Sequence, residues 1–218
     1  MAKRKVSNPL ALAVLGLLIE KPMHPYEMSS TMRERVKEAS IKLNYGSLYS
    51  VVDALQRHGL IEVRETVREG RRPERTVYAI TDPGRTEFVD WLSELVSVPV
   101  KEYTQFEAAL SLLPGLPPDE VLRLLTTRRS RLESELIGTQ AILDRMTDQG
   151  MYLLAIELDY VQELRKAELG FVERVIKWIQ NGTLGGITFW RQAYEGGEMP
   201  SAEDWQRAAE GTLPPDAR

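Results

Sequence analysis

The stretch LNYGSLYSVVDALQRHG, residues 43–59, decides the fold of this chain because it carries both a start and a stop signal for one short helix. Asn44 is a favoured N-cap residue, and Gly59 is a favoured residue just after a helix end. Together they predict a helix over residues 44–58. Its apolar residues recur at three- and four-residue spacing and form one stripe: Leu48, Val51, Val52 and Leu55.

The rest of this helix surface is small, hydroxylated or aromatic and carries a single charge. Its residues are Tyr45, Gly46, Ser47, Tyr49, Ser50 and Asp53. A solvated helix face usually carries Lys and Glu, so this composition favours a surface that approaches another molecule closely. An ordinary surface helix of a small α-rich domain is the alternative that the helix alone leaves open.

Two further helices are predicted before this one. Asn8 and Pro9 form a helix start, and the almost wholly apolar run that follows up to Glu20 predicts a central core helix. The second helix begins near Pro25, and its inner side is expected to carry Tyr26, Met28 or Ser29, Met32 and Val36. The tight connection from this helix to the next gives a helix-turn-helix pattern.

A β-hairpin is predicted directly after the three helices. Residues 60–66 and 75–81 alternate apolar and polar side chains, and residues 67–74 contain Gly70 and Pro73, which indicate a turn. Three helices followed by a hairpin is the order of a winged helix. The arginines at the hairpin tip are Arg68, Arg71, Arg72 and Arg75. Their position favours contact with a phosphate backbone, although a solvated turn is the alternative.

The second half of the chain predicts mainly helices. A helix capped by Thr81 carries Phe88, Trp91, Leu92 and Leu95 on one face, and a short helix begins near Glu102. Two long helices are predicted over residues 117–147 and 152–181. The apolar stripe of the first is Leu122, Leu125, Leu132, Leu136, Leu143 and Met146, with Arg129 and Thr139 in its gaps. The stripe of the second is Leu154, Leu158, Val161, Leu164, Phe171, Val175 and Trp178.

Two long antiparallel helices without a third sizeable element to cover them imply a partner chain. A hairpin closed on the preceding helices within one chain is the alternative. The expected fold class is therefore mainly α with a small β-hairpin, an N-terminal winged helix-turn-helix being joined to a long-helix dimerisation domain. The expected domains are residues 1–98 for DNA binding, residues 99–182 for dimerisation and residues 183–218 as a partly ordered tail.

Composition narrows the class of function further. The 218 residues carry a net charge of −4, but residues 1–82 hold 14 basic and 10 acidic residues, so a basic unit precedes an acidic one. Cys is absent and only two His are present, so we expect neither a metal site nor a cofactor. No apolar run reaches 18 residues, so we expect no membrane span and a cytoplasmic location. No catalytic motif is present, so we expect no enzyme.

Three motifs in this order resemble the PadR family of bacterial transcriptional regulators. They are LGLLIEKPMHPYEM (15–28), NYGSLYSVVDALQRHGLIE (44–62) and GRRPERTVYAITDPGR (70–85). The C-terminal helices are similar to those of the longer, virulence-activator-like members. Pro25 stands where the family usually has a glycine, and we expect a stiffer turn there because a proline can begin a helix.

The resemblance implies a homodimer that binds an inverted repeat in double-stranded DNA, usually as a repressor. It assigns DNA contacts to Tyr45, Gly46, Ser47 and Tyr49 in the helix and to Arg71 and Arg72 in the wing. It also implies a small-molecule effector at the dimer interface, for which Phe88 and Trp91 form one candidate site. The alternative is that both aromatic side chains belong to the core. A winged-helix adaptor that binds protein and not DNA is the remaining alternative function.

Overall fold

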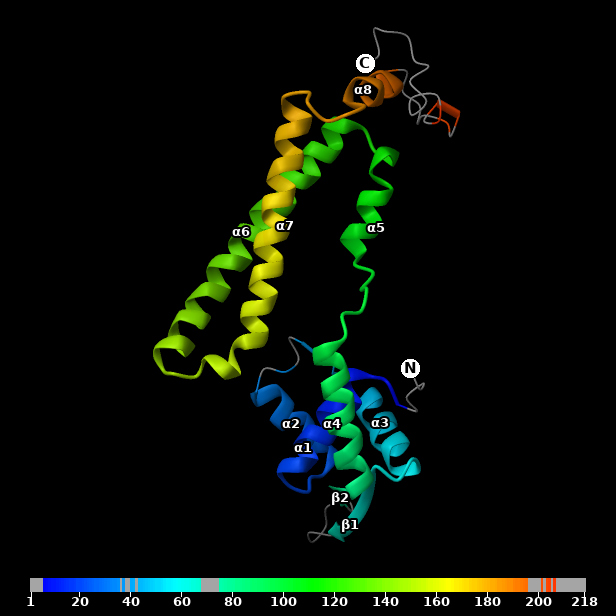
Figure 1. Cartoon of the computed structure of the whole chain (residues 1–218), viewed down its shortest axis with the longest axis vertical. Coiled ribbons are helices and arrows are strands. Elements are labelled where there is room, and N and C mark those ends of the chain that lie inside the picture. The colour runs from blue at the N-terminus through cyan, green and yellow to red at the C-terminus, as the bar shows by residue number, and fades with distance from the viewer. Residues whose placement is uncertain are drawn as a thin grey trace. The chain divides into compact units, whose positions relative to one another are not determined.

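The computed structural model describes residues 6–35, 37, 40–41, 43–67, 75–195, 201, 203–204 and 206. The chain divides into two compact units, residues 1–101 and residues 102–218. Figure 1 shows the helices and strands of the chain, and each unit has its own cluster of buried apolar side chains. The first unit contains three helices, a hairpin and a fourth helix, and the second unit is helical throughout its described part.

The first unit is built around its first helix. Its elements are α1 (Pro9–Glu20), α2 (Pro25–Glu34), α3 (Tyr45–Arg57), β1 (Ile61–Val67), β2 (Arg75–Ile80) and α4 (Asp82–Ser97). The Asn8 side chain accepts a hydrogen bond from the Leu10 amide at 2.9 Å, and Pro9 takes the first helical position, as the sequence predicted. Half of α1 is fully buried, and the helix contacts α3, α4 and β2. This helix is therefore the centre of the unit.

Helix α2 ends at Glu34, earlier than the sequence suggested. Met28, Ser29 and Met32 are buried, as predicted, whereas Tyr26 is 59% exposed and its predicted place on the inner side is wrong. The buried residue at this end of the helix is Pro25, so the ring of the proline fills the inner position and turns Tyr26 outward. Val36, the last predicted inner residue, lies outside the described residues.

The hairpin is attached to the core at its base. Strands β1 and β2 pair antiparallel from Ile61 opposite Ile80 to Val67 opposite Arg75, with an irregularity after Val63. Both isoleucines at the base are buried. Met23, in the loop before α2, exchanges two backbone hydrogen bonds of 3.0 Å with Tyr78 of β2. The base of the hairpin is thereby fixed to the core and to the loop before α2.

Helix α4 covers α1 with only part of its predicted face. Trp91 is 4% exposed and belongs to the core, and Phe88 packs against it from a half-buried position. Leu92 and Leu95 are 41% and 50% exposed, so only the part of the predicted apolar face that carries Phe88 and Trp91 packs on the core. The core reaches only one side of α4, and the two leucines lie beyond it.

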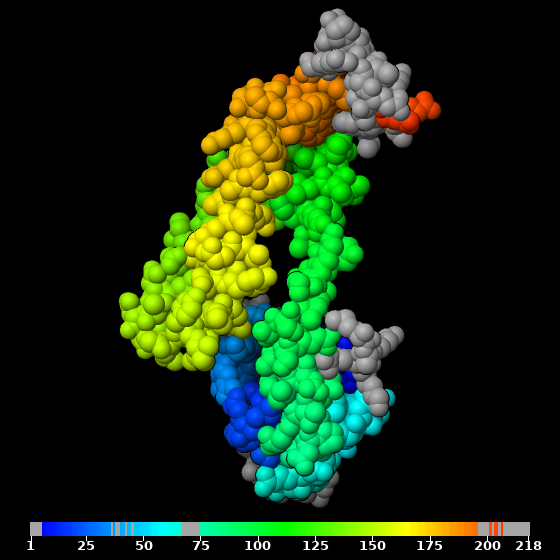
Figure 2. Space-filling view, viewed as in Figure 1, coloured from blue at the N-terminus to red at the C-terminus, as the bar shows by residue number. Residues whose placement is uncertain are grey.

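The second unit is a long helical hairpin with short helices at one end. Its elements are α5 (Gln105–Ser111), η2 (Leu113–Gly115), α6 (Pro118–Asp148), η3 (Tyr152–Leu154), α7 (Ile156–Gln180) and α8 (Ile187–Glu195). Helices α6 and α7 lie side by side and antiparallel, and α8, in orange, lies at the end of the pair (Figure 2). The indole nitrogen of Trp190 donates a hydrogen bond to the Leu116 carbonyl at 3.0 Å, which ties α8 to the loop before α6.

The seam between α6 and α7 confirms the predicted stripe of α6 but only a small part of that of α7. Leu125, Leu132, Thr139 and Leu143 of α6 are buried. On α7 the predicted Val175 is buried, whereas the other buried residues, Gln162, Val172, Ile176 and Ile179, lie outside the predicted stripe. Leu154 and Leu164, predicted to lie in the seam, are 60% and 53% exposed.

Polar pairs set the phase of α7 against α6. The amide of Gln162 donates to the side-chain oxygen of Gln140, and the guanidinium of Arg165 lies 3.1 Å from the Glu135 carboxylate. Because Gln162 and Arg165 are polar, the hydrophobic pattern of the sequence does not place them in the seam. The exposed leucines of α7 consequently belong to a second apolar stripe that no described element of the chain covers. None of the described helices has the length and apolarity needed to cross a membrane.

Candidate nucleic-acid interface

The N-terminal end of α3 is capped as the sequence predicted. Asn44 has an extended backbone, and its side-chain oxygen accepts a hydrogen bond from the Ser47 amide at 2.7 Å. The other amides in the first turn of a helix have no acceptor within the helix, and the helix dipole adds positive potential at this end. An exposed helix start of this kind favours a phosphate group.

The residues assigned to DNA in the sequence meet at this end of α3. Tyr45 is the first helical residue, followed by Gly46 and Ser47, and Tyr49 lies about one turn further on. Gly46 is exposed, and a Cβ added there would meet only the Asn44 side-chain oxygen, at 3.8 Å. Tyr49 is 47% exposed. The chain therefore offers hydroxyl groups and a close-approach position together on one turn and a half of helix.

The outward face of α3 continues beyond these four residues. Gly46, Ser50, Asp53 and Arg57 follow at four-, three- and four-residue spacing and are all exposed, opposite the buried stripe. Ser50 donates its hydroxyl to the Gly46 carbonyl at 2.9 Å. Gln56 joins the last three residues around a shallow hollow on this face. Gln56 and Arg57 were missed from the sequence, where only the phase set by the buried stripe could have indicated them.

The hairpin supplies basic residues beside α3, although the predicted pair lies elsewhere. Arg71 and Arg72 lie outside the described residues. Within the described strands, Arg64 on β1 and Arg75 on β2 are exposed. Burial, and secondarily the positive charge of Arg75, lower the pKa of His24 below its usual value, against an opposite effect of Glu27. Arg75 therefore lies close enough to the start of α2 to act on it electrostatically.

Tyr78 links the hairpin to α3. Its pKa is raised first by burial and then by the charges of Asp53 and Tyr49 on α3. The side chain of Tyr78 is half-buried in the described structure. The outward face of α3 and the hairpin base thus form one electrostatically connected surface.

The two aromatic residues considered for an effector lie against the core of the first unit. Trp91 is 4% exposed, and the ring of Phe88 is so close to α1 that a Cβ added at Gly16 would lie 3.2 Å from its Cε2 atom. These contacts fit the alternative of a core role. An effector role for the pair stays a prediction.

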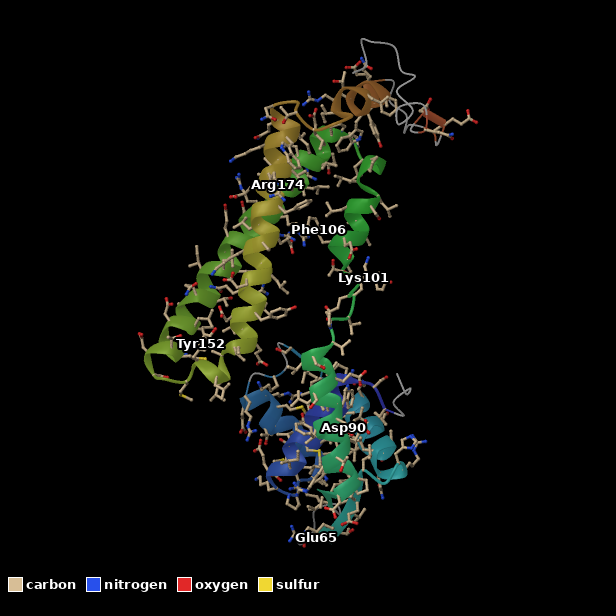
Figure 3. The ribbon with its side chains drawn as sticks, viewed as in Figure 1. Glu65, Asp90, Lys101, Phe106, Tyr152 and Arg174 are labelled. Atoms are coloured by element: carbon tan, nitrogen blue, oxygen red, sulfur yellow. The ribbon has the colours of Figure 1, made fainter. Side chains whose placement is uncertain are left out.

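The second unit has a hollow of about 630 Å³ between α5, α6 and α7. Its apolar lining includes Leu112 and Leu124, which are 74% and 40% exposed. Phe106 lies on the side of α5 that faces the long helices (Figure 3), and the Arg128 guanidinium stacks 3.7 Å from the centre of its ring. No residue of α5 is buried. This short helix is thus covered on one side only.

No metal site is found in the described part of the chain, where no three His, Cys, Asp or Glu side chains are grouped suitably.

Comparison with known proteins finds similarity to transcriptional regulators. The pattern of the family described as "Transcriptional regulator PadR-like family" matches residues 14–90. This range runs from within α1 into α4 and contains the whole helix-turn-helix and hairpin.

Two relatives agree with this match. The negative transcriptional regulator PadR of Bacillus subtilis (strain 168) is 23% identical over 137 residues, which cover 63% of this chain and 74% of that protein. Its crystal structure in complex with operator DNA has a TM-score of 0.63 at 22% identity and covers 80% of this chain and 99% of that one. Its structure in complex with p-coumaric acid has a TM-score of 0.61 at 22% identity and covers 78% and 98%.

The second relative is the virulence activator AphA of Vibrio cholerae, with a TM-score of 0.58 at 16% identity over 79% of this chain and 98% of that one. At these identities the solved structures show a shared fold that extends into the C-terminal helices. Residues 14–90 thus match the PadR-like family of transcriptional regulators, and the chain shares the fold of the solved PadR and AphA structures.

Proposed function

We propose that this protein is a homodimeric transcriptional repressor that binds an inverted-repeat operator through α3 and the hairpin. The observation that carries the proposal is the capped N-terminal end of α3, whose exposed hydroxyl groups stand beside an arginine-bearing hairpin on the same core. The Bacillus subtilis relative is described as a negative regulator and has been solved with operator DNA. Such a repressor would act in the bacterial cytoplasm.

In this proposal α3 enters the major groove with its N-terminal end. Ser47 and Tyr49 donate hydrogen bonds to phosphates or base edges, and Gly46 lets the backbone come close. Tyr45 stands at the same end of the helix. Arg71 and Arg72 at the hairpin tip contact phosphates or the minor groove. The phosphate contacts set the position on the duplex, and the remaining outward residues of α3 read the sequence.

The proposed dimer explains the uncovered apolar surface of the second unit. Leu153, Tyr160 and Leu164 are 79%, 65% and 53% exposed and follow one another at seven- and four-residue spacing along η3 and α7. This is the spacing of a helix seam, and monomeric proteins rarely leave such a stripe in water. A second copy of the chain would cover the stripe and the open side of α5. Two α3 helices would then be about one turn of DNA apart.

The DNA-binding proposal is tested by fluorescence anisotropy of a labelled fragment from upstream of the gene, beside a scrambled fragment of the same length. Tight binding to the first fragment alone, weakening as salt is raised, is expected, and its slope estimates the number of phosphate contacts. The double variant Arg71→Ala/Arg72→Ala should weaken binding to both fragments and flatten the slope. Absence of binding to any DNA at low salt would favour the protein-binding adaptor instead.

The dimer proposal is tested by sedimentation equilibrium. Wild type should sediment as two chains, and the double variant Tyr160→Glu/Leu164→Glu should sediment as one, because it places carboxylates in the proposed seam. Glu173→Gln, an exposed change elsewhere on α7, is the matched control and should remain dimeric. A double variant that stays dimeric would contradict the proposed seam.

An effector is proposed on a separate ground. A relative has been solved with p-coumaric acid, so a small aromatic acid is the first class of compound to test against the DNA complex of this protein. If Phe88 and Trp91 form the effector site, Trp91→Ala should give a folded dimer that no longer responds to such a compound. If they serve the core, as their burial favours, the same variant should lose stability.

A further inference from the structure

The middle of the outward face of α3 carries a carboxylate, a group that DNA ordinarily repels. Asp53 is exposed, three residues after Ser50 and four before Arg57, so these three side chains lie in one row along the helix. The buried stripe that fixes the phase of α3 lies opposite this row. In the proposed complex Asp53 therefore faces the groove and not the flank of the helix.

Nothing in the described part of the chain neutralises the Asp53 carboxylate by a hydrogen bond or an ion pair. The nearest cation in the row, Arg57, donates its Nε–H group to the backbone carbonyl of Asp53 at 3.4 Å and not to the carboxylate. An ionised carboxylate only accepts hydrogen bonds. When α3 meets DNA, Asp53 must therefore face a donor or lose its hydration without compensation.

Every base pair offers one amino donor in the major groove, but the groups beside this donor differ between the bases. Guanine presents two acceptors, thymine presents an acceptor and a methyl group, and adenine presents an amino group beside the N7 acceptor. Cytosine presents the N4 amino group, which carboxylates are known to read. Phosphates repel the group at every sequence. Cytosine is thus the base that best satisfies an Asp side chain in this position.

We propose that Asp53 is a specificity-determining residue that selects one cytosine in each operator half-site by accepting a hydrogen bond from its N4 amino group. The inference rests on the proposed function, in which α3 enters the major groove. Much of the selectivity comes from rejection, because guanine and thymine offer the carboxylate no donor and adenine places the N7 acceptor beside its amino group. A wrong base pair at this position should weaken binding by about tenfold in each half-site.

The test is selection of bound duplexes from a pool with a randomised central region, followed by sequencing, with the full-length protein. Wild type should select an inverted repeat with one strongly preferred cytosine in each half. Asp53→Asn should change the preference at that position to adenine, since an amide pairs with the N6 and N7 groups of adenine. Asp53→Ala should leave the position without a preference. All other positions of the motif should remain unchanged.

Asp90→Asn is the matched control because Asp90 is an exposed aspartate of the same unit, on α4 (Figure 3). It should keep the cytosine. If Asp53→Asn and Asp53→Ala select the wild-type motif and change affinity equally for all sequences, Asp53 acts only through its charge and the inference is wrong, although the DNA-binding proposal stands. If wild type selects no motif, both proposals fail.

Discussion

Replacing Asn44 separates the stability of α3 from its proposed contact with DNA. In Asn44→Ala the 2.7 Å hydrogen bond from the Ser47 amide is lost. Loss of an N-cap costs about 0.5–2 kcal/mol, and because Asn44 is exposed, water replaces part of the bond. We expect the free energy of unfolding of the first unit to fall by about 1 kcal/mol. With a urea slope of about 2 kcal/mol/M, the midpoint should fall by roughly 0.5 M.

Asn44→Asp should behave differently because aspartate is an equally good cap and also favours the positive end of the helix dipole. Its stability should match that of wild type. The new charge, however, would meet a phosphate at the proposed interface. Two unit charges at roughly 6 Å in water repel by about 0.7 kcal/mol, which is about threefold in affinity per half-site and about tenfold for two.

Urea unfolding followed by circular dichroism and anisotropy with operator DNA measure the two effects separately. Asn44→Ser should resemble wild type in both assays because it keeps the cap without adding a charge. Full stability of Asn44→Ala would refute the capping role. Unchanged DNA affinity of Asn44→Asp, at the same low salt concentration, would refute the reasoning that the start of α3 lies against a phosphate.

Three further changes test other parts of the structure. Gly84→Ala should destabilise the first unit by about 3 kcal/mol in urea unfolding, because the added Cβ would lie 2.0 Å from the Leu60 carbonyl oxygen. Trp190→Phe should cost the second unit about 1 kcal/mol in the same assay, through loss of the indole hydrogen bond to Leu116. The pKa of His24 is lowered in the fold, so the unfolded chain binds the proton more readily and stability should fall as the pH drops below the unfolded value near 6.5. Thermal unfolding at pH 7.5 and 5.5 should show this loss, and His24→Asn, which keeps an N-cap acceptor, should reduce it.

The sequence predicts a feature well when residues within that feature determine it, and poorly when tertiary contacts determine it. The bounds of α3 were predicted within one residue because Asn44 acts through its own side chain and Gly59 through its own backbone, which has a positive φ of 70°. The phase of α7 was predicted wrongly because its contacts with α6, apolar and polar, are tertiary. Gln162 is only 1% exposed, whereas the hydrophobic pattern predicted that Leu164 would be the buried residue.

The candidate site divides in the same way. The motif at the start of α3 pointed to Gly46, Ser47 and Tyr49, because unusual residue types stand out from an ordinary helix surface. Gln56 and Arg57 are ordinary surface residues, and the structure groups them with Ser50 and Asp53 around one shallow hollow. Residue type thus indicated where the site begins, whereas the fold was needed to show how far it extends.

The two apolar stripes of α7 also explain why hydrophobic spacing gave an ambiguous prediction. A helix that joins two seams carries apolar residues on two faces, and a single stripe drawn through them mixes both. Here one face of α7 packs on α6 within the chain, and on the other face Tyr160 and Leu164 are exposed to solvent. Helix α5, with seven residues and none of them buried, is too short to be stable by itself. The proposed dimer, in which another copy of the chain covers the second unit, would account for both the order of α5 and the outer stripe of α7.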